Sequence, residues 1–138
     1  MNTNGVLNGK KIFLMTDDGT VAENVQKSLA AHGAVLFHDS TPKEAIGNAL
    51  AKNPDLLIYD ERMPAYHGLK PLSVIKRARP KSKVLFLARN GTPLRSMDAT
   101  AQGVSFTIQS DSSPQQIYNA VKHCLAIASV PRIEAMAE

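Results

Sequence analysis

Five short apolar runs alternate with helical patterns along this chain, and this alternation constrains the fold more than any other feature. Each run is too short for a helix and has the length of a strand that is buried on both faces. Between the runs, apolar residues recur at spacings of three and four, which is typical of amphipathic helices. The five runs comprise residues 12–15, 35–37, 56–59, 84–87 and 104–108.

Local signals mark where the predicted helices begin and end. Residues 41–44 (TPKE) and 113–116 (SPQQ) have the pattern of capping boxes with proline at the first helical position. Gly33 is expected to end the first helix. Two further helices are predicted over residues 67–78 and 93–102.

Repeated strand–helix units with short connections require a parallel sheet and right-handed crossovers. We therefore expect an α/β fold: a three-layer αβα sandwich around a five-stranded parallel sheet. The flavodoxin-like strand order 2-1-3-4-5 is the natural candidate. A chain of 138 residues is one domain's worth. We expect residues 10–128 to form this domain, with tails at residues 1–9 and 129–138.

The composition disfavours several classes of protein. No apolar run approaches the ~20 residues that a membrane span needs, and the polar N-terminus does not resemble a signal peptide. A single cysteine, Cys124, rules out an internal disulfide and fits a reducing compartment. Glycine-rich dinucleotide motifs and a P-loop are both missing from the sequence.

Acidic residues follow the first and third apolar runs, at Asp17, Asp18 and Asp60. Strands one and three are neighbours in the predicted order, so the three carboxylates should meet at the carboxyl edge of the sheet. Carboxylates in one site repel each other, and a hard cation such as Mg²⁺ relieves this repulsion. The sequence therefore predicts a magnesium site with the Arg62 carbonyl as a further ligand. The alternative is that these residues are solvated acids at strand ends.

The segment from Pro54 to Gly68 carries the most specific motif: an apolar strand, Asp60, two residues, Met-Pro and a later glycine. On this motif and the acidic pair, the chain resembles a CheY-like response-regulator receiver domain over about residues 10–127. The resemblance implies that Asp60 accepts a phosphoryl group, with Mg²⁺, from a histidine kinase or a phosphotransfer protein. It also implies signalling to a downstream protein rather than enzymatic activity, beyond self-phosphorylation from a phosphodonor. By the same resemblance we expect a cytoplasmic, bacterial protein.

The chain departs from the family's pattern at its switch positions. Where the family has Ser or Thr after strand four, this chain has Ala88, which cannot hydrogen-bond a phosphoryl oxygen. The family's lysine falls on Ser110, or on Gln109 after a one-residue shift, and its aromatic switch residue falls on Thr107. The departures suggest an atypical, degenerate receiver with a weakened switch.

Two hypotheses remain open. The first is a single-domain receiver in a phosphorelay, whose partner surface includes Phe106, Ile117 and Tyr118. The second is a phosphorylation-independent pseudo-receiver that binds a protein, or an anionic nucleotide such as a cyclic dinucleotide, through an arginine-rich surface. Arg62 and Arg89 are the candidate anion contacts next to the acidic site. Binding of nucleic acid rests on charge alone and ranks last. The arginines available to that surface are Arg62, Arg77, Arg79, Arg89 and Arg95.

Overall fold

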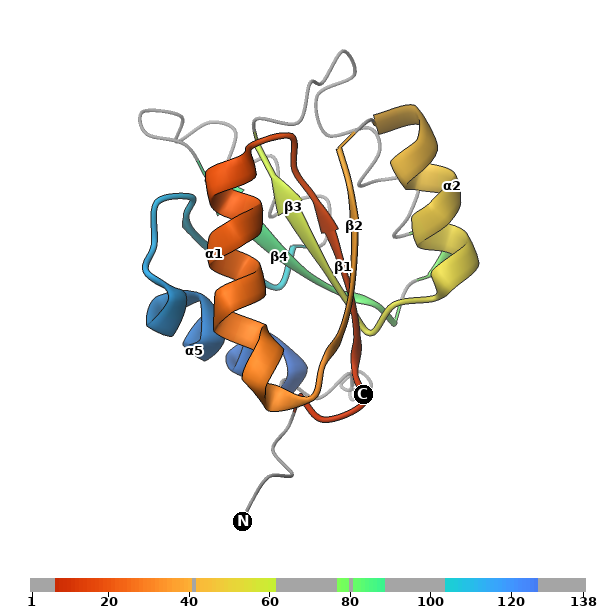
Figure 1. The fold of residues 1–138 in the computed structure, drawn as a ribbon. Helices are drawn as coiled ribbons and strands as arrows, with labels where there is room; N and C mark the ends of the chain where they lie inside the picture. Colours follow the sequence, from red (N-terminus) through yellow and green to blue (C-terminus); the bar gives the residue numbers. More distant parts are fainter. Residues whose placement is uncertain (1–6, 41, 62–76, 80, 89–103, 127–138) are drawn as a thin grey trace.

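The computed structural model describes residues 7–40, 42–61, 77–79, 81–88 and 104–126. A five-stranded, all-parallel sheet with the order β2-β1-β3-β4-β5 forms the middle layer (Figure 1). The predicted α/β class and strand order are therefore confirmed. The strands are β1 (Lys11–Met15), β2 (Val35–Asp39), β3 (Leu56–Asp60), β4 (Lys83–Ala88) and β5 (Phe106–Gln109).

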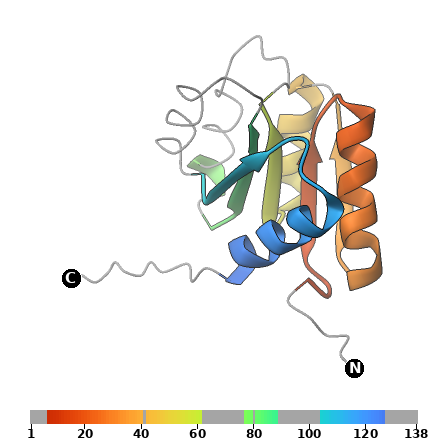
Figure 2. The ribbon, with the colours of Figure 1, turned by 90° about the vertical axis from the view of Figure 1, so that its left-hand side faces the viewer.

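Helices cover both faces of the sheet. Helices α1 (Gly19–Leu29) and α5 (Pro114–Ala126) lie side by side on one face, and α2 (Pro42–Lys52) lies on the other (Figures 1 and 2). A short 3-10 helix (Ala30–His32) extends α1. The predicted helices over residues 67–78 and 93–102 lie outside the described residues, except that residues 77 and 78 are helical. None of the described helices has the length and apolar character needed to cross a membrane.

The sheet separates two apolar clusters. Alternate residues of β3 enter each one: Leu56 and Ile58 pack with α1 and α5, whereas Leu57 and Tyr59 face the side of α2. Every residue of β3 is buried, as expected for a central strand of a parallel sheet. Leu7 also lies in the first cluster. The packed region therefore begins before residue 10, the boundary expected from the sequence.

The local signals at two helix ends act as predicted. The Ser113 N–H donates to Gln116 Oε1 (2.8 Å), and the Gln116 N–H donates to Ser113 Oγ (3.2 Å), so this capping box is formed. Gly33 adopts a left-handed conformation (φ 80°) after the 3-10 helix. The other predicted capping box begins at residue 41, outside the described residues.

Candidate functional site

The carboxyl ends of β1 and β3 bring Thr16 and Asp60 together. Met15, the last residue of β1, pairs with Tyr59 of β3, so the next residues of both strands are neighbours. Asp60 ends β3 and is 0% exposed. A fully buried acid needs hydrogen-bond partners, because burial of an uncompensated charge is very costly.

Thr16 is a partner of Asp60 that the sequence analysis missed. Its hydroxyl donates to Asp60 Oδ2 (2.6 Å) and accepts from the Asp18 N–H (3.1 Å). The Thr16 main chain is held too: its N–H donates to the Asp39 carbonyl (3.3 Å), and its carbonyl accepts from His38 Nε2 (2.9 Å). A polar residue directly after an apolar strand and before the acidic doublet was the available signal.

The two residues of the acidic doublet differ in their surroundings. Asp18 is partly buried, and its Oδ1 accepts from the N–H groups of Thr20 (2.9 Å) and Val21 (3.4 Å), so its side chain is the N-cap of α1. Asp17 is exposed. In the described ranges, no three acidic, histidine or cysteine side chains come together as a metal-binding group. The fourth predicted ligand, the Arg62 carbonyl, lies outside those ranges.

The ends of β4 and β5 carry the predicted switch positions. Ala88 is buried and pairs with Gln109, and the Ser110 N–H donates to the Ala88 carbonyl (2.8 Å) one residue beyond β5. The neighbour of Ala88 across the strands is thus polar and uncharged. Thr107 pairs with Phe86 and is half-buried. The adjacent Phe106 is 39% exposed and contacts the His123 ring. Arg89 lies outside the described residues.

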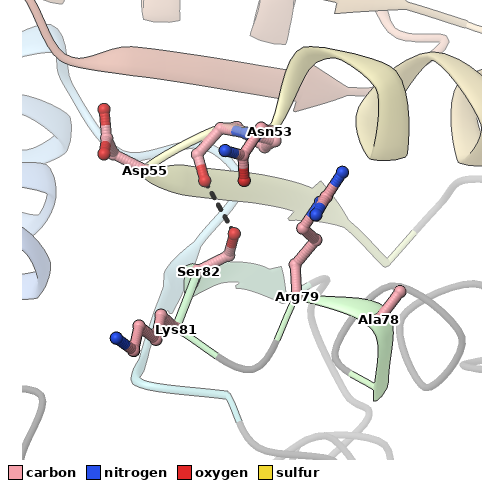
Figure 3. A pocket seen from close by; sticks show the side chains of 7 residues that line it. Asn53, Asp55, Ala78, Arg79, Lys81 and Ser82 are labelled. Atoms are coloured by element: carbon pink, nitrogen blue, oxygen red, sulfur yellow. Dashed lines mark hydrogen bonds between the residues drawn. The ribbon is translucent and has the colours of Figure 1, made fainter.

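A second polar site lies at the amino ends of the strands, where β3 and β4 begin (Figure 3). Its Arg79 side chain donates from Nη2 to the carbonyl of Leu50 in α2 (2.8 Å). Arg79 Nε is buried and has no hydrogen-bond partner among the described residues. The pocket has a volume of about 430 Å³. It is lined by Asn53, Pro54, Asp55, Ala78, Arg79, Lys81 and Ser82.

A buried acid at the end of the third strand of a parallel αβα sandwich is the arrangement of a receiver domain. A model of the response regulator receiver domain family matches residues 12–122 of the chain. The chain belongs to this family, which confirms the resemblance seen in the sequence.

Curated relatives include the DNA-binding transcriptional regulator NtrC of Salmonella typhimurium and of Escherichia coli, each 26% identical over 92 residues, or 67% of this chain. The chain spans about a fifth of the length of these relatives (20%).

Several solved structures share the fold. The CheY-like receiver domain protein of Methanospirillum hungatei has a TM-score of 0.78 at 19% identity, covering 86% of this chain and 94% of that one. The chemotaxis regulator CheY4 of Vibrio cholerae has a TM-score of 0.76 at 17% identity, covering 85% and 99%. NtrX of Brucella abortus has a TM-score of 0.81 at 17% identity, covering 94% of this chain and 30% of that one.

Proposed function

We propose that this receiver domain of two-component signalling accepts a phosphoryl group on Asp60. The observation that carries the proposal is the placement of Asp60: a fully buried carboxylate at the carboxyl end of the central strand, held by a hydroxyl of the neighbouring strand end. Open α/β sheets place their reacting groups at this edge. The donor is a histidine kinase or a phosphotransfer protein, and the recipient of the signal is a downstream protein.

The reaction is a transfer between nucleophiles. An oxygen of Asp60 attacks the phosphorus of the donor, and a new O–P bond forms while the bond between phosphorus and the leaving group breaks. The electron pair of the broken bond leaves with the donor, and the product is an acyl phosphate. Receiver domains are signalling domains rather than enzymes, so this self-modification is their chemistry.

Receiver domains in general bind Mg²⁺ at the acidic phosphorylation site, where the ion neutralises charge on the phosphoryl oxygens. In this chain the residues fit such a site only in part, because Asp18 caps α1 and Asp17 is exposed. We propose that Asp17, Asp18, Asp60 and the Arg62 carbonyl bind the ion weakly.

We further propose that phosphorylation is weakly reported at β4 and β5. Ala88 offers no hydroxyl, and neither Gln109 nor Ser110 offers a cation. A charge-assisted hydrogen bond from lysine would be worth about 1.5–3 kcal/mol to the phosphoryl group. We propose that the domain is an atypical receiver that acts by protein–protein contact, in the cytoplasm.

Mass spectrometry of the intact protein after incubation with acetyl phosphate and Mg²⁺ tests the proposal. We expect one added phosphoryl group in the wild type and none in Asp60→Asn, which keeps the size of the side chain. Phosphorylation of Asp60→Asn to the same extent would place the acceptor elsewhere. No modification of the folded wild type, by acetyl phosphate or by a panel of phosphorylated kinases, would favour the pseudo-receiver.

The Arg79 pocket supports the alternative, a binding module for an anionic nucleotide such as a cyclic dinucleotide. The supporting observation is the buried Arg79 Nε, a donor without a partner among the described residues. Calorimetry with a cyclic dinucleotide should then show binding that is lost in Arg79→Gln. It should be kept in Arg77→Gln, because Arg77 is exposed and is not among the residues lining the pocket. Equal heats from both variants, or none from the wild type, would remove this alternative.

A further inference from the structure

We propose that Thr16 is a positioning residue for phosphoryl transfer to Asp60, and that its hydroxyl passes the change in charge at Asp60 to the start of α1. This inference rests on the proposed function of Asp60. It is carried by the hydrogen-bond chain that runs from the Asp18 N–H through Thr16 Oγ1 to Asp60 Oδ2.

Thr16 is well suited to hold another group in place. Its side chain is completely buried, and its main-chain N–H and carbonyl are bonded to residues 39 and 38 at the end of β2. The residue that supplies the hydroxyl is therefore fixed to the framework of the sheet on both sides of its Cα. The short separation between Thr16 Oγ1 and Asp60 Oδ2 (2.6 Å) is that of a charge-assisted O–H···O⁻ bond.

The hydrogen bond determines how the carboxylate is presented. A donor on Oδ2 restricts rotation of the carboxyl group about its terminal torsion, which is otherwise broad. Because a lone pair of Oδ2 is engaged by Thr16, we assign the attack on phosphorus to Oδ1. Correct orientation of a nucleophile contributes much of the rate of a transfer reaction.

The hydrogen bond between Thr16 and Asp60 also changes when Asp60 is phosphorylated. When Oδ1 forms its bond to phosphorus, Oδ2 becomes the carbonyl oxygen of an acyl phosphate and loses its share of the negative charge. A charge-assisted hydrogen bond is thereby replaced by a weaker neutral one. Hydrogen bonds in a chain polarise one another, so the bond from the Asp18 N–H to Thr16 Oγ1 changes as well.

Asp18 then connects this change to α1. Its main chain donates to Thr16, and its side chain caps the first turn of the helix. The route runs through the loop between β1 and α1, away from Ala88 and the end of β5. A receiver that lacks the usual groups at β4 and β5 would therefore still report its phosphorylation, through α1.

Two variants separate the role of the hydroxyl from that of the side chain's shape. Thr16→Val keeps the branched shape and removes the donor, whereas Thr16→Ser keeps the donor and removes a methyl group. We expect the rate of phosphorylation by acetyl phosphate to fall about ten- to a hundredfold in Thr16→Val. In Thr16→Ser it should stay within a fewfold of wild type. An unchanged rate in folded Thr16→Val would overturn the positioning role.

A second measurement does not require phosphorylation. Asp60→Asn removes the charge of the carboxylate, and NMR should show a shift of the Asp18 amide in this variant. When Asp60→Asn is introduced into Thr16→Val instead of the wild type, the Asp18 amide should hardly shift. The spectra to compare are those of Thr16→Val and of the double variant Thr16→Val/Asp60→Asn. An equal shift in both backgrounds would overturn the coupling. If Thr16→Val does not fold, the coupling is tested by Asp60→Asn alone, and an unmoved Asp18 amide in that variant would overturn it.

The two measurements also separate this inference from the proposed function. In one outcome the wild type is not phosphorylated, but Asp60→Asn still shifts the Asp18 amide through Thr16. This outcome would reject Asp60 as the acceptor, and with it the positioning role of Thr16. It would keep the coupling between Asp60 and the start of α1. In the other outcome the wild type is phosphorylated, but neither the rate of phosphorylation nor the shift of the Asp18 amide depends on Thr16. This outcome would reject the inference about Thr16 and keep Asp60 as the acceptor.

Discussion

Replacing Asp18 tests how much its side chain contributes to the stability of the first helix. Its Oδ1 accepts from the N–H groups of Thr20 and Val21, and the first turn of α1 contains no acidic residue. Asp18→Ala removes the cap, worth ~0.5–2 kcal/mol, and the charge at the positive end of the helix dipole, worth ~0.3–1 kcal/mol. Asp18→Asn loses only the charge, because asparagine is an equally good N-cap.

We therefore expect Asp18→Ala to lower the free energy of unfolding by about 1–2 kcal/mol, and Asp18→Asn by less than about 1 kcal/mol. For a domain of this size, the larger loss corresponds to a fall in Tm of roughly 3–10 °C. Urea unfolding followed by far-UV circular dichroism suits this chain, because it has no tryptophan to serve as a fluorescent probe. Asp17→Asn is the matched control, since Asp17 is exposed.

One result would refute this reasoning. Equal destabilisation by asparagine and alanine would show that charge, and not the cap, is what Asp18 contributes. A magnesium titration by NMR tests the proposed ion site separately. Asp18→Asn should weaken the binding of Mg²⁺, and unchanged binding would remove Asp18 from the proposed ligands.

Three further predictions concern the switch, the lone thiol and one turn. With a phosphodonor, amide signals of residues 106–109 should move less than those of residues 16–21; a larger movement in β5 would show that the usual switch survives. Burial raises the pKa of Cys124 from 9.0 to about 12, partly offset by the nearby charge of Lys83. Between these values the unfolded chain has lost a proton that the native state keeps, so stability should fall with rising pH, by up to about 1.4 kcal/mol per unit. Urea unfolding of Cys124→Ala across this range should show a shallower fall, and an identical slope would contradict the assignment. Gly33→Ala should destabilise by about 1–2 kcal/mol in thermal unfolding, since the turn has φ 80° and a Cβ would clash with Asn8; unchanged stability would show that the turn relaxes.

Much of the fold was predictable because its signals are local or periodic. Strands buried on both faces must be apolar throughout, and β3 is such a strand at every position before Asp60. The capping box at Ser113 depends only on residues three apart in the chain, and it forms as the sequence predicts. Short connections between units then leave few topologies for the sheet.

The candidate site could be predicted only in part, because the sequence does not show which groups contact each acid. Asp60 lies where the sequence places it, at the end of the central strand. Asp18 is predicted from the sequence as a metal ligand, and the structure adds that its carboxylate caps α1. Aspartate is both a good N-cap and a good ligand, so its residue type alone does not decide between the two.

The sequence by itself determined the parallel sheet, the order of its strands and the position of the candidate acceptor, because these follow from which residues must be buried and how short the connections are. Only the tertiary structure decided which groups surround that residue. Thr16 and Asp60 are 44 residues apart, and the pairing of β1 with β3 brings the hydroxyl to the carboxylate. Hydrogen bonds across strand ends depend on distances of a few ångströms, which periodicity along the chain does not encode.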